Sequence, residues 1–181
     1  MVLTYSLSEA DYLAQQLFVA SNNERVRKYR QRNRIIWPIA FLGLGLAFYS
    51  YNSTFLAYYF LGFSLLYFFF YPAYSKWFYK RFYRKNLIEA YKNRFNKQFT
   101  VDINPEGLLI SDHTGETNVL ISEIERIDEI ADYIFPKFKS GSTFIIPKSK
   151  VDQLDALIQE LKEIAAQQNI IYSENLFWEW K

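Results

Sequence analysis

Residues 35–75 read IIWPIAFLGLGLAFYSYNSTFLAYYFLGFSLLYFFFYPAYS, and none of these 41 residues is Asp, Glu, Lys, Arg or His. A spanning helix needs about 20 mostly apolar residues to cross a hydrocarbon core of roughly 30 Å, so the run is long enough for two crossings. A soluble helical hairpin would show a polar face, and neither half of the run does. The polar cluster SYNST at residues 50–54 supplies a turn. We therefore expect a two-helix transmembrane hairpin with spans at about residues 35–51 and 54–74.

Basic residues flank both ends of this run, whereas the loop between the two spans carries no charge. Because Lys and Arg resist translocation, we expect both flanks and both termini in the cytoplasm and the loop on the far side of the membrane. The flanking cations are also the candidate contacts for anionic lipid headgroups, although topology alone accounts for their presence. These residues are Arg25, Arg27, Lys28, Arg30, Arg32, Arg34, Lys76, Lys80, Arg81, Arg84 and Lys85.

The residue types within the spans indicate how the helices pack and which functions are excluded. Gly43 and Ala47 form a small-xxx-small pair, which lets helices approach closely either within the hairpin, near Gly62, or between two copies of the chain. The spans contain no Asp, Glu, Lys, Arg or His, which argues against a transporter or a proton path. Aromatic rings near the span ends are typical of membrane interfaces. Here they are Trp37, Tyr49, Tyr51, Tyr71, Tyr74 and Trp77.

Helical patterns continue beyond both ends of the hairpin. Ser8 begins one of them, with Asp11 three residues later as an approximate capping box. After Asn22 and Asn23 the chain becomes strongly basic without Pro or Gly, so a helix continues into the first span. Residues 76–95 alternate aromatic and basic side chains in the same way. Both patterns predict helical stalks on the cytoplasmic side.

From residue 98 the pattern changes to short strands and turns, with turn sequences at residues 104–107 and 112–115. An amphipathic helix begins near residue 147 and carries an apolar stripe from Val151 to Ala165. We therefore expect an α+β membrane protein with two parts: residues 1–97 form the hairpin and stalks, and residues 98–181 form a small antiparallel β-sheet domain closed by a C-terminal helix. The expected strands cover residues 99–103, 108–110, 117–121, 124–131, 133–138 and 143–146.

The net charge of +2 hides a sharp division along the chain. Residues 1–97 contain 14 Lys/Arg against 4 Asp/Glu, whereas residues 98–181 contain 7 against 15. A nucleic-acid-binding protein would be basic throughout its binding domain, so we expect no nucleic-acid partner. The opposite charges lead instead to the hypothesis that the acidic domain rests against the basic stalks.

The chain offers little catalytic chemistry. It has no cysteine, which excludes thiolate catalysis and Cys-based metal sites. Its one histidine, His113, falls in a predicted turn next to Asp112 and Thr114, where such residues serve the backbone conformation. No phosphate loop or nucleophile–base set is present. We therefore expect neither an enzyme nor a cofactor or metal site.

Two stretches of the C-terminal part resemble a known family. Residues 119–138 read VLISEIERIDEIADYIFPKF and residues 142–151 read STFIIPKSKV. Together with the two preceding spans, they resemble the YcxB-like family of bacterial membrane proteins. A typical member has a tryptophan where this chain has Ile121. The resemblance implies a pleckstrin-homology-like domain, a further strand from residues 2–6, and a place in the bacterial plasma membrane, with no catalytic residues to transfer.

These features favour a membrane-anchored cytoplasmic interaction or regulatory module. The alternative is an anionic-lipid-binding or membrane-organising protein that acts through its basic stalks. Its partners are then the lipid bilayer and either another protein or a second copy of the chain. The aromatic end LFWEW at residues 176–180 either folds back onto the stalks or the bilayer interface, or binds a partner.

Overall fold

A computed structural model of the chain describes residues 1–104, 107–112 and 115–180. The described chain mixes helices with antiparallel β-sheet and divides into two compact units. Met1–Gln15 and Leu87–Glu179 form the β unit, and Gln16–Asn86 together with Trp180 form the helical unit. The units do not divide at residue 97, because the N-terminal strand pairs with a strand that begins at Gln98.

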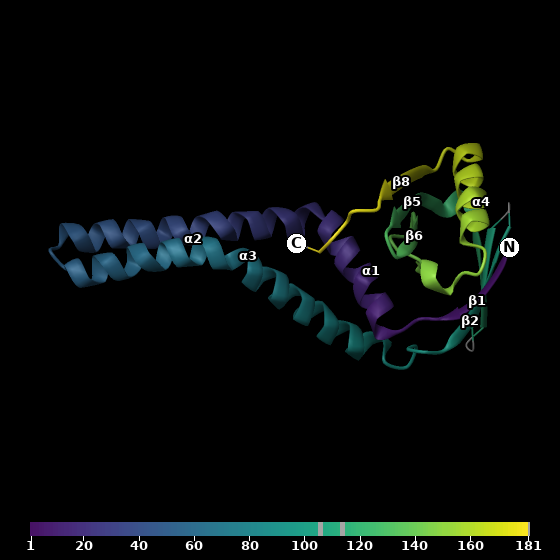
Figure 1. Ribbon diagram of the computed structural model, residues 1–181, viewed down its shortest axis with the longest axis horizontal. Helices are drawn as coiled ribbons and strands as arrows, with labels where there is room; N and C mark the ends of the chain where they lie inside the picture. The colour runs from purple at the N-terminus through teal and green to yellow at the C-terminus, as the bar shows by residue number, and fades with distance from the viewer. Residues whose placement is uncertain (105–106, 113–114, 181) are drawn as a thin grey trace. The chain divides into compact units, whose positions relative to one another are not determined.

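Two long helices make up most of the helical unit (Figure 1). Helix α2 covers Glu24–Ser50 and helix α3 covers Thr54–Tyr91, with Asn52 in the left-handed conformation between them. Helix α1, Glu9–Asn22, precedes α2, and the Asn23 side chain caps α2 by accepting hydrogen bonds from two backbone N–H groups. The predicted helical continuation is confirmed on both sides of residues 35–74, although α3 ends at Tyr91 and not at residue 95.

Helices α2 and α3 pack side by side near their connecting turn. A Cβ atom at Gly45 would lie 2.9 Å from Cγ of Leu61, so glycine is needed for the close approach. The buried Ser64 hydroxyl donates to the carbonyl oxygen of Pro38 at 2.8 Å, and this bond joins the two helices. Gly43 and Gly62 face open space. The prediction that Gly43 packs near Gly62 within the hairpin is therefore wrong, and Gly45 takes that role.

The first sheet of the β unit contains the N-terminal strand. Strands β1 (Val2–Ser6), β2 (Gln98–Ile103), β3 (Gly107–Asp112) and β4 (Gly115–Leu120) pair antiparallel in that order. Alternate residues point into the core because side chains alternate across a strand. The added strand from residues 2–6 is confirmed. Buried side chains on the inner face include Leu3, Tyr5, Val101, Ile103 and Leu108.

The second sheet departs from a simple meander. Strands β7 (Ile146–Pro147), β6 (Tyr133–Phe138) and β5 (Ile124–Ile130) are antiparallel neighbours. Strand β8, Ile171–Asn175, was not predicted and pairs parallel with β5. A parallel neighbour needs a long crossover connection, which here includes helix α4, Leu154–Gln167. The prediction of a purely antiparallel meander is wrong in this respect.

Helix α4 begins later than predicted. Lys148–Lys150 form a short 3₁₀ turn, and Val151 is extended, so the chain cannot be helical from residue 147. The apolar stripe is confirmed, because the residues of α4 that are buried are Leu157, Leu161, Ile164 and Ala165. The two sheets meet in the core, where the Tyr5 hydroxyl donates to the carbonyl oxygen of Ile145 at 2.7 Å. His113 and parts of both predicted turns lie outside the described residues.

Candidate functional site

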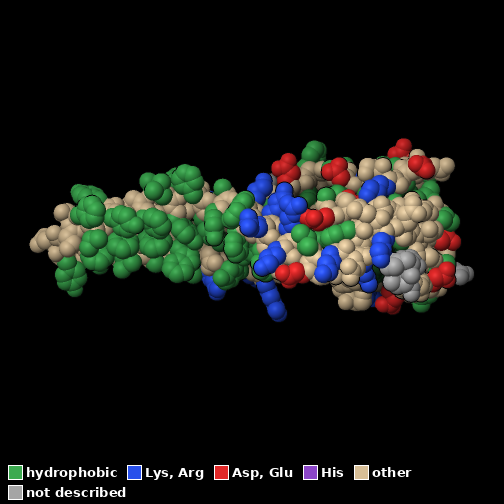
Figure 2. All heavy atoms as spheres, turned by 90° about the horizontal axis from the view of Figure 1, so that it is seen from below, with side chains coloured by type: hydrophobic (Ala, Val, Ile, Leu, Met, Phe, Trp, Pro, Cys, Tyr) green, Lys and Arg blue, Asp and Glu red, His purple; other side chains and the backbone are tan. Residues whose placement is uncertain are grey.

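The helical unit exposes a long apolar surface. Ile39 on α2 and Leu65 and Phe69 on α3 are each more than 60% exposed, at 63%, 61% and 67%. Figure 2 shows hydrophobic side chains covering this unit, with Lys and Arg side chains gathered toward one end. A large contiguous apolar surface that is exposed in this way marks a site of contact with another protein or with a membrane.

Helix α3 is long and apolar enough to cross a membrane, with 38 residues from Thr54 to Tyr91. Helix α2 differs because only sixteen uncharged residues separate Arg34 from the connecting turn. At 1.5 Å per residue these reach about 24 Å, somewhat less than a hydrocarbon core of roughly 30 Å. By length and composition, α3 is the one candidate span among the described residues.

The predicted lipid-contact cations lie together at one end of the helical unit, which we call the basic belt. Six come from the first turns of α2 and five from the part of α3 beyond Ser75. The two sets meet because the helices are antiparallel neighbours. The Arg30 Nε donates to the Ser75 hydroxyl at 3.0 Å, and the Arg34 guanidinium lies 5.0 Å from the Phe68 ring centre.

Ten of the eleven belt cations are exposed, and Arg30 is half-buried. Glu24 is the one acid in the helical unit, and its carboxylate pairs with Lys28 at 3.0 Å. Eight belt residues form no ion pair with a carboxylate in the described part of the chain. The belt therefore carries uncompensated positive charge that can contact lipid phosphates. The eight are Arg25, Arg27, Arg32, Arg34, Lys76, Lys80, Arg81 and Lys85.

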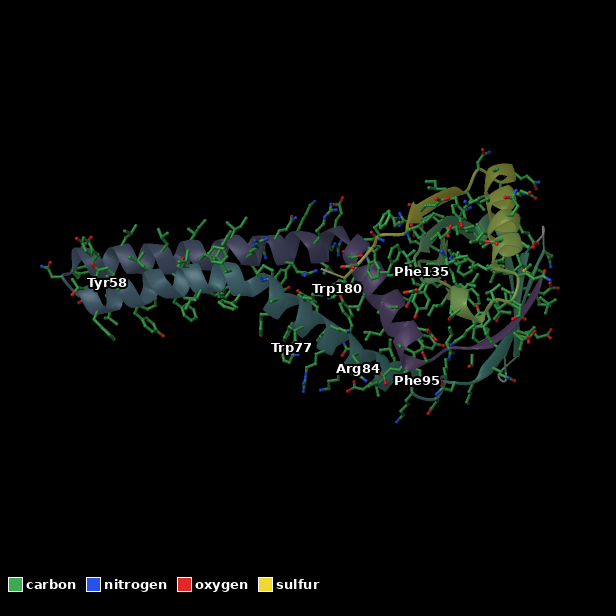
Figure 3. All side chains as sticks on the ribbon, viewed as in Figure 1. Tyr58, Trp77, Arg84, Phe95, Phe135 and Trp180 are labelled. Atoms are coloured by element: carbon green, nitrogen blue, oxygen red, sulfur yellow. The ribbon has the colours of Figure 1, made fainter. Side chains whose placement is uncertain are left out.

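Arg30 is partly covered by Trp180 at the aromatic C-terminal end. Its guanidinium lies 4.7 Å from the Trp180 ring centre and 5.4 Å from that of Tyr79. The Trp180 indole N–H donates to the carbonyl oxygen of Lys76 at 3.1 Å, and Trp180 is only 7% exposed. Trp180 thus folds back onto the stalks, which is one of the alternatives predicted for this end, whereas Phe177 is 98% exposed. Figure 3 shows Trp180 beside the helices of the helical unit and Trp77 on α3.

Aromatic side chains occur at both ends of the apolar surface. Tyr49 and Tyr51 lie at the turn, and Tyr58 lies near the same end of the helix pair (Figure 3). Tyr74 and Trp77 lie on α3 next to the belt. From residue 58 to residue 74 the helix rises about 24 Å, which is somewhat less than the hydrocarbon thickness of roughly 30 Å. Of the predicted interface aromatics, Tyr71 is half-buried and the others are exposed.

Most of the cations in the β unit are neutralised by nearby acids. Lys148 pairs with Glu129 at 2.6 Å, with both groups nearly buried. Burial would raise the pKa of Glu129, but hydrogen bonds from Lys148 and the Tyr172 hydroxyl lower it overall. These cations are therefore poorly placed to form a headgroup pocket. The other pairs are Arg126–Asp128, Lys137–Glu125, Lys150–Asp11 and Lys162–Glu174.

Within the described residues, no group of three or more His, Cys, Asp or Glu side chains is arranged to hold a metal ion. Comparison of the chain with protein-family models, with curated proteins and with solved structures gives no match. The resemblance to the YcxB-like family therefore stays a prediction from the sequence.

Proposed function

We propose that this chain is an integral membrane protein whose helical unit anchors the β unit to the cytoplasmic face of a bacterial plasma membrane. The observation that carries the proposal is the exposed apolar surface of α2 and α3, which ends at the basic belt. Lipid tails solvate such a surface, and the headgroup region accommodates the belt.

In this proposal α2 crosses the membrane beside α3. Its uncharged part is short, but long Arg side chains near a helix end reach back to the headgroups. A bilayer also thins locally around a short span at a modest cost. The Ser64–Pro38 hydrogen bond supports the pairing, because such bonds join helices in a membrane. Both termini then lie in the cytoplasm.

The β unit acts as the interaction or regulatory part of the molecule and not as an enzyme. In the chain, two long helices are followed by strands, the amphipathic helix α4 and strand β8, and this order supports the proposal that the β unit is YcxB-like and pleckstrin-homology-like. The unit presents exposed Phe177 at its end, which is a candidate contact for a protein partner or a second copy of the chain.

Binding of anionic lipid is the second candidate function. It rests on the eight belt cations that have no carboxylate partner in the described part of the chain. Retention of anionic lipid during purification would support it, whereas co-purification of a single protein would support the first function. The two outcomes are separable because the belt and the β unit can be altered independently.

Topology is testable because the chain has no native cysteine. Single variants Ser50→Cys, Asn86→Cys and Asp155→Cys each place one thiol at an exposed position. We expect a membrane-impermeant maleimide to label Ser50→Cys in intact cells and the other two only after permeabilisation. Labelling of Asn86→Cys in intact cells, or protection of Ser50→Cys, contradicts the proposed orientation.

A further inference from the structure

The β unit contains a hollow of about 320 Å³ at one end of its two packed sheets. Its lining includes Phe99 from β2, Phe144 and Ile145 from the segment before β7, and Tyr12 from α1. Arg94 and Lys97, from the segment that follows α3, also line the hollow. The volume falls at the lower end of the range for small-molecule sites, which is about 300–1,000 Å³.

The floor of the hollow is apolar and firmly held. The Phe99 and Phe144 rings meet edge to face with centres 5.9 Å apart, and Tyr5 packs against Phe99 at 4.5 Å. The Tyr5 hydroxyl donates to the carbonyl oxygen of Ile145, so this buried tyrosine ties β1 to the second sheet. An apolar ligand part would meet a preformed surface here.

One wall comes from aromatic stacking. The Tyr12 ring stacks on Tyr91, with ring centres 5.1 Å apart, and lies 5.7 Å from the Phe95 ring centre. These contacts join the start of α1 to the residues that lead out of α3. They position the segment that carries the two cations.

The cationic segment itself is anchored to the backbone of the β unit. Asn96 adopts the left-handed conformation, with φ of 58°, and its N–H donates to the carbonyl oxygen of Leu7 at 2.8 Å. The Arg94 N–H donates to the carbonyl oxygen of Tyr91 at 2.8 Å. Arg94 and Lys97, on either side of Asn96, are thereby held beside the hollow.

The charge of this lining is opposite to that of its surroundings. The β unit has twice as many Asp/Glu as Lys/Arg, yet the described residues of the lining include two cations and no Asp or Glu. Arg94 forms no ion pair within the described part of the chain. A positive mouth above an apolar floor is complementary to an anion that carries an apolar group.

We propose that this hollow binds a small amphipathic anion. The carboxylate or phosphate of the ligand contacts Arg94 and Lys97, and its apolar body packs against Phe99 and Phe144. A bidentate Arg contact suits both oxyanions. The ligand is either a fatty acid or related lipid product released from the membrane, or a soluble organic acid. The proposal does not depend on membrane insertion of the helical unit.

The test uses the full chain in nanodiscs of zwitterionic lipid, with empty nanodiscs as the blank for partitioning. Octanoate represents the lipid source, 3-phenylpropanoate the soluble source, and octanol an uncharged control. Hydrogen–deuterium exchange reports protection of residues 94–99 and 144–145, and titration gives each Kd. We expect saturable protection by at least one acid and none by octanol. The acid that protects identifies the source.

Three variants make the test specific. Arg94→Gln/Lys97→Gln removes the cations, and Thr117→Trp fills the hollow from the exposed edge strand. Lys92→Gln/Lys139→Gln removes the same charge at exposed positions outside the lining. We expect the first two to weaken acid binding at least tenfold and the third less than twofold. Absence of saturable binding by either acid, or equal affinity in wild type and Arg94→Gln/Lys97→Gln, overturns the proposal.

Discussion

At the scale of single residues, Gly45 sets the separation of α2 and α3. The nearest atoms to a Cβ built there are Cγ and Cδ2 of Leu61, at 2.9 and 3.0 Å, and the carbonyl oxygen of Ala57 at 3.2 Å. A side chain at this position would push the helices apart, whereas one at Gly43 would meet nothing within 4 Å.

We therefore predict that Gly45→Ala destabilises the helical unit by about 1–3 kcal/mol, the usual cost of overpacking. The matched variant Gly43→Ala should be neutral or slightly stabilising, since alanine favours a helix by up to about 1 kcal/mol over glycine. Thermal unfolding of both variants in the same detergent measures the difference. Equal melting temperatures would contradict the observed packing.

Which glycine faces the neighbouring helix was not predictable from the sequence. Residues 43 and 45 lie about 200° apart around a helix with 3.6 residues per turn, so they face nearly opposite sides. The small-xxx-small pattern identifies Gly43 and Ala47 but contains no information on how α2 is rotated about its axis. The belt cations were easier to find, because charge next to an apolar run is visible in the sequence alone.

Asp11 is a second residue whose role follows from its contacts. Its carboxylate accepts hydrogen bonds from Ser8 and from the Tyr133 hydroxyl, and it pairs with Lys150 at 3.0 Å. Burial would raise the pKa of Asp11, but the bonds from Ser8, Lys150 and Tyr133 lower it overall. Its stabilising effect is therefore complete above the ordinary Asp value of about 4 and is lost as the pH falls through the lowered value.

We predict that Asp11→Asn destabilises the β unit at pH 7 by about 1–3 kcal/mol, the usual cost of an unpaired buried partner. The difference in the free energy of unfolding between Asp11→Asn and wild type should shrink as the pH falls below about 4, because Asp11 of the wild type then becomes protonated. Asp128 and Glu129 are present in both proteins, so the comparison isolates Asp11. Hydrogen exchange of β5 and β6 in the full chain measures this difference in stability. A difference that does not change with pH would contradict the stabilising role of the Asp11 carboxylate.

At the scale of whole elements, β1 forms one edge of the first sheet. It pairs with β2 from Val2↔Asp102 to Ser6↔Gln98, although the two strands are almost a hundred residues apart in the sequence. Leu3 is 7% exposed and Val2 is 64% exposed, so adjacent positions sample the two faces of one strand.

Leu3→Ala should therefore cost the β unit about 2–5 kcal/mol, the range for a truncated core leucine. Val2→Ala should cost less than about 0.5 kcal/mol, as is usual for an exposed position. Hydrogen exchange of β2 gives the readout for both variants. Similar effects at the two positions would show that the β1–β2 register is incorrect.

The sequence predicts some of these elements better than others. The amphipathic stripe of α4 and the alternation in β2 are local patterns, and both were visible. Strand β8 was missed because it is half-exposed and needs its neighbour β5 for its hydrogen bonds. The pocket cations Arg94 and Lys97 were assigned to a stalk, because the stacking of Tyr12 on Tyr91 that joins them to the β unit is a long-range contact. The one local signal for this site was the position of Arg94 and Lys97 shortly before strand β2.

At the scale of the whole molecule, charge is divided between the two units. The helical unit contains eleven Lys/Arg between residues 16 and 86 and a single acid, whereas the β unit is acidic. If the belt lies among headgroups, each well-placed cation contributes about 1 kcal/mol of attraction to anionic lipid.

We predict that Lys76→Gln/Lys80→Gln weakens the preference for anionic over zwitterionic lipid by about 2 kcal/mol, or roughly 30-fold. The control Lys92→Gln/Lys139→Gln should change it little, since these residues lie outside the belt. Native mass spectrometry of lipids retained from a defined mixture provides the measurement. Unchanged retention in Lys76→Gln/Lys80→Gln would rule out the lipid-binding function of the belt at these positions.

The proposed topology, the placement of the belt among lipid headgroups and the anchoring of the β unit all depend on the apolar surface of α2 and α3 lying in the bilayer. The environment of this surface is tested most directly by washing membranes from expressing cells with alkaline carbonate and then separating them by ultracentrifugation. We predict that the chain stays in the membrane pellet and is released only by detergent. Recovery of folded, monodisperse protein in the detergent-free supernatant would contradict the assignment of residues 35–75 to the bilayer.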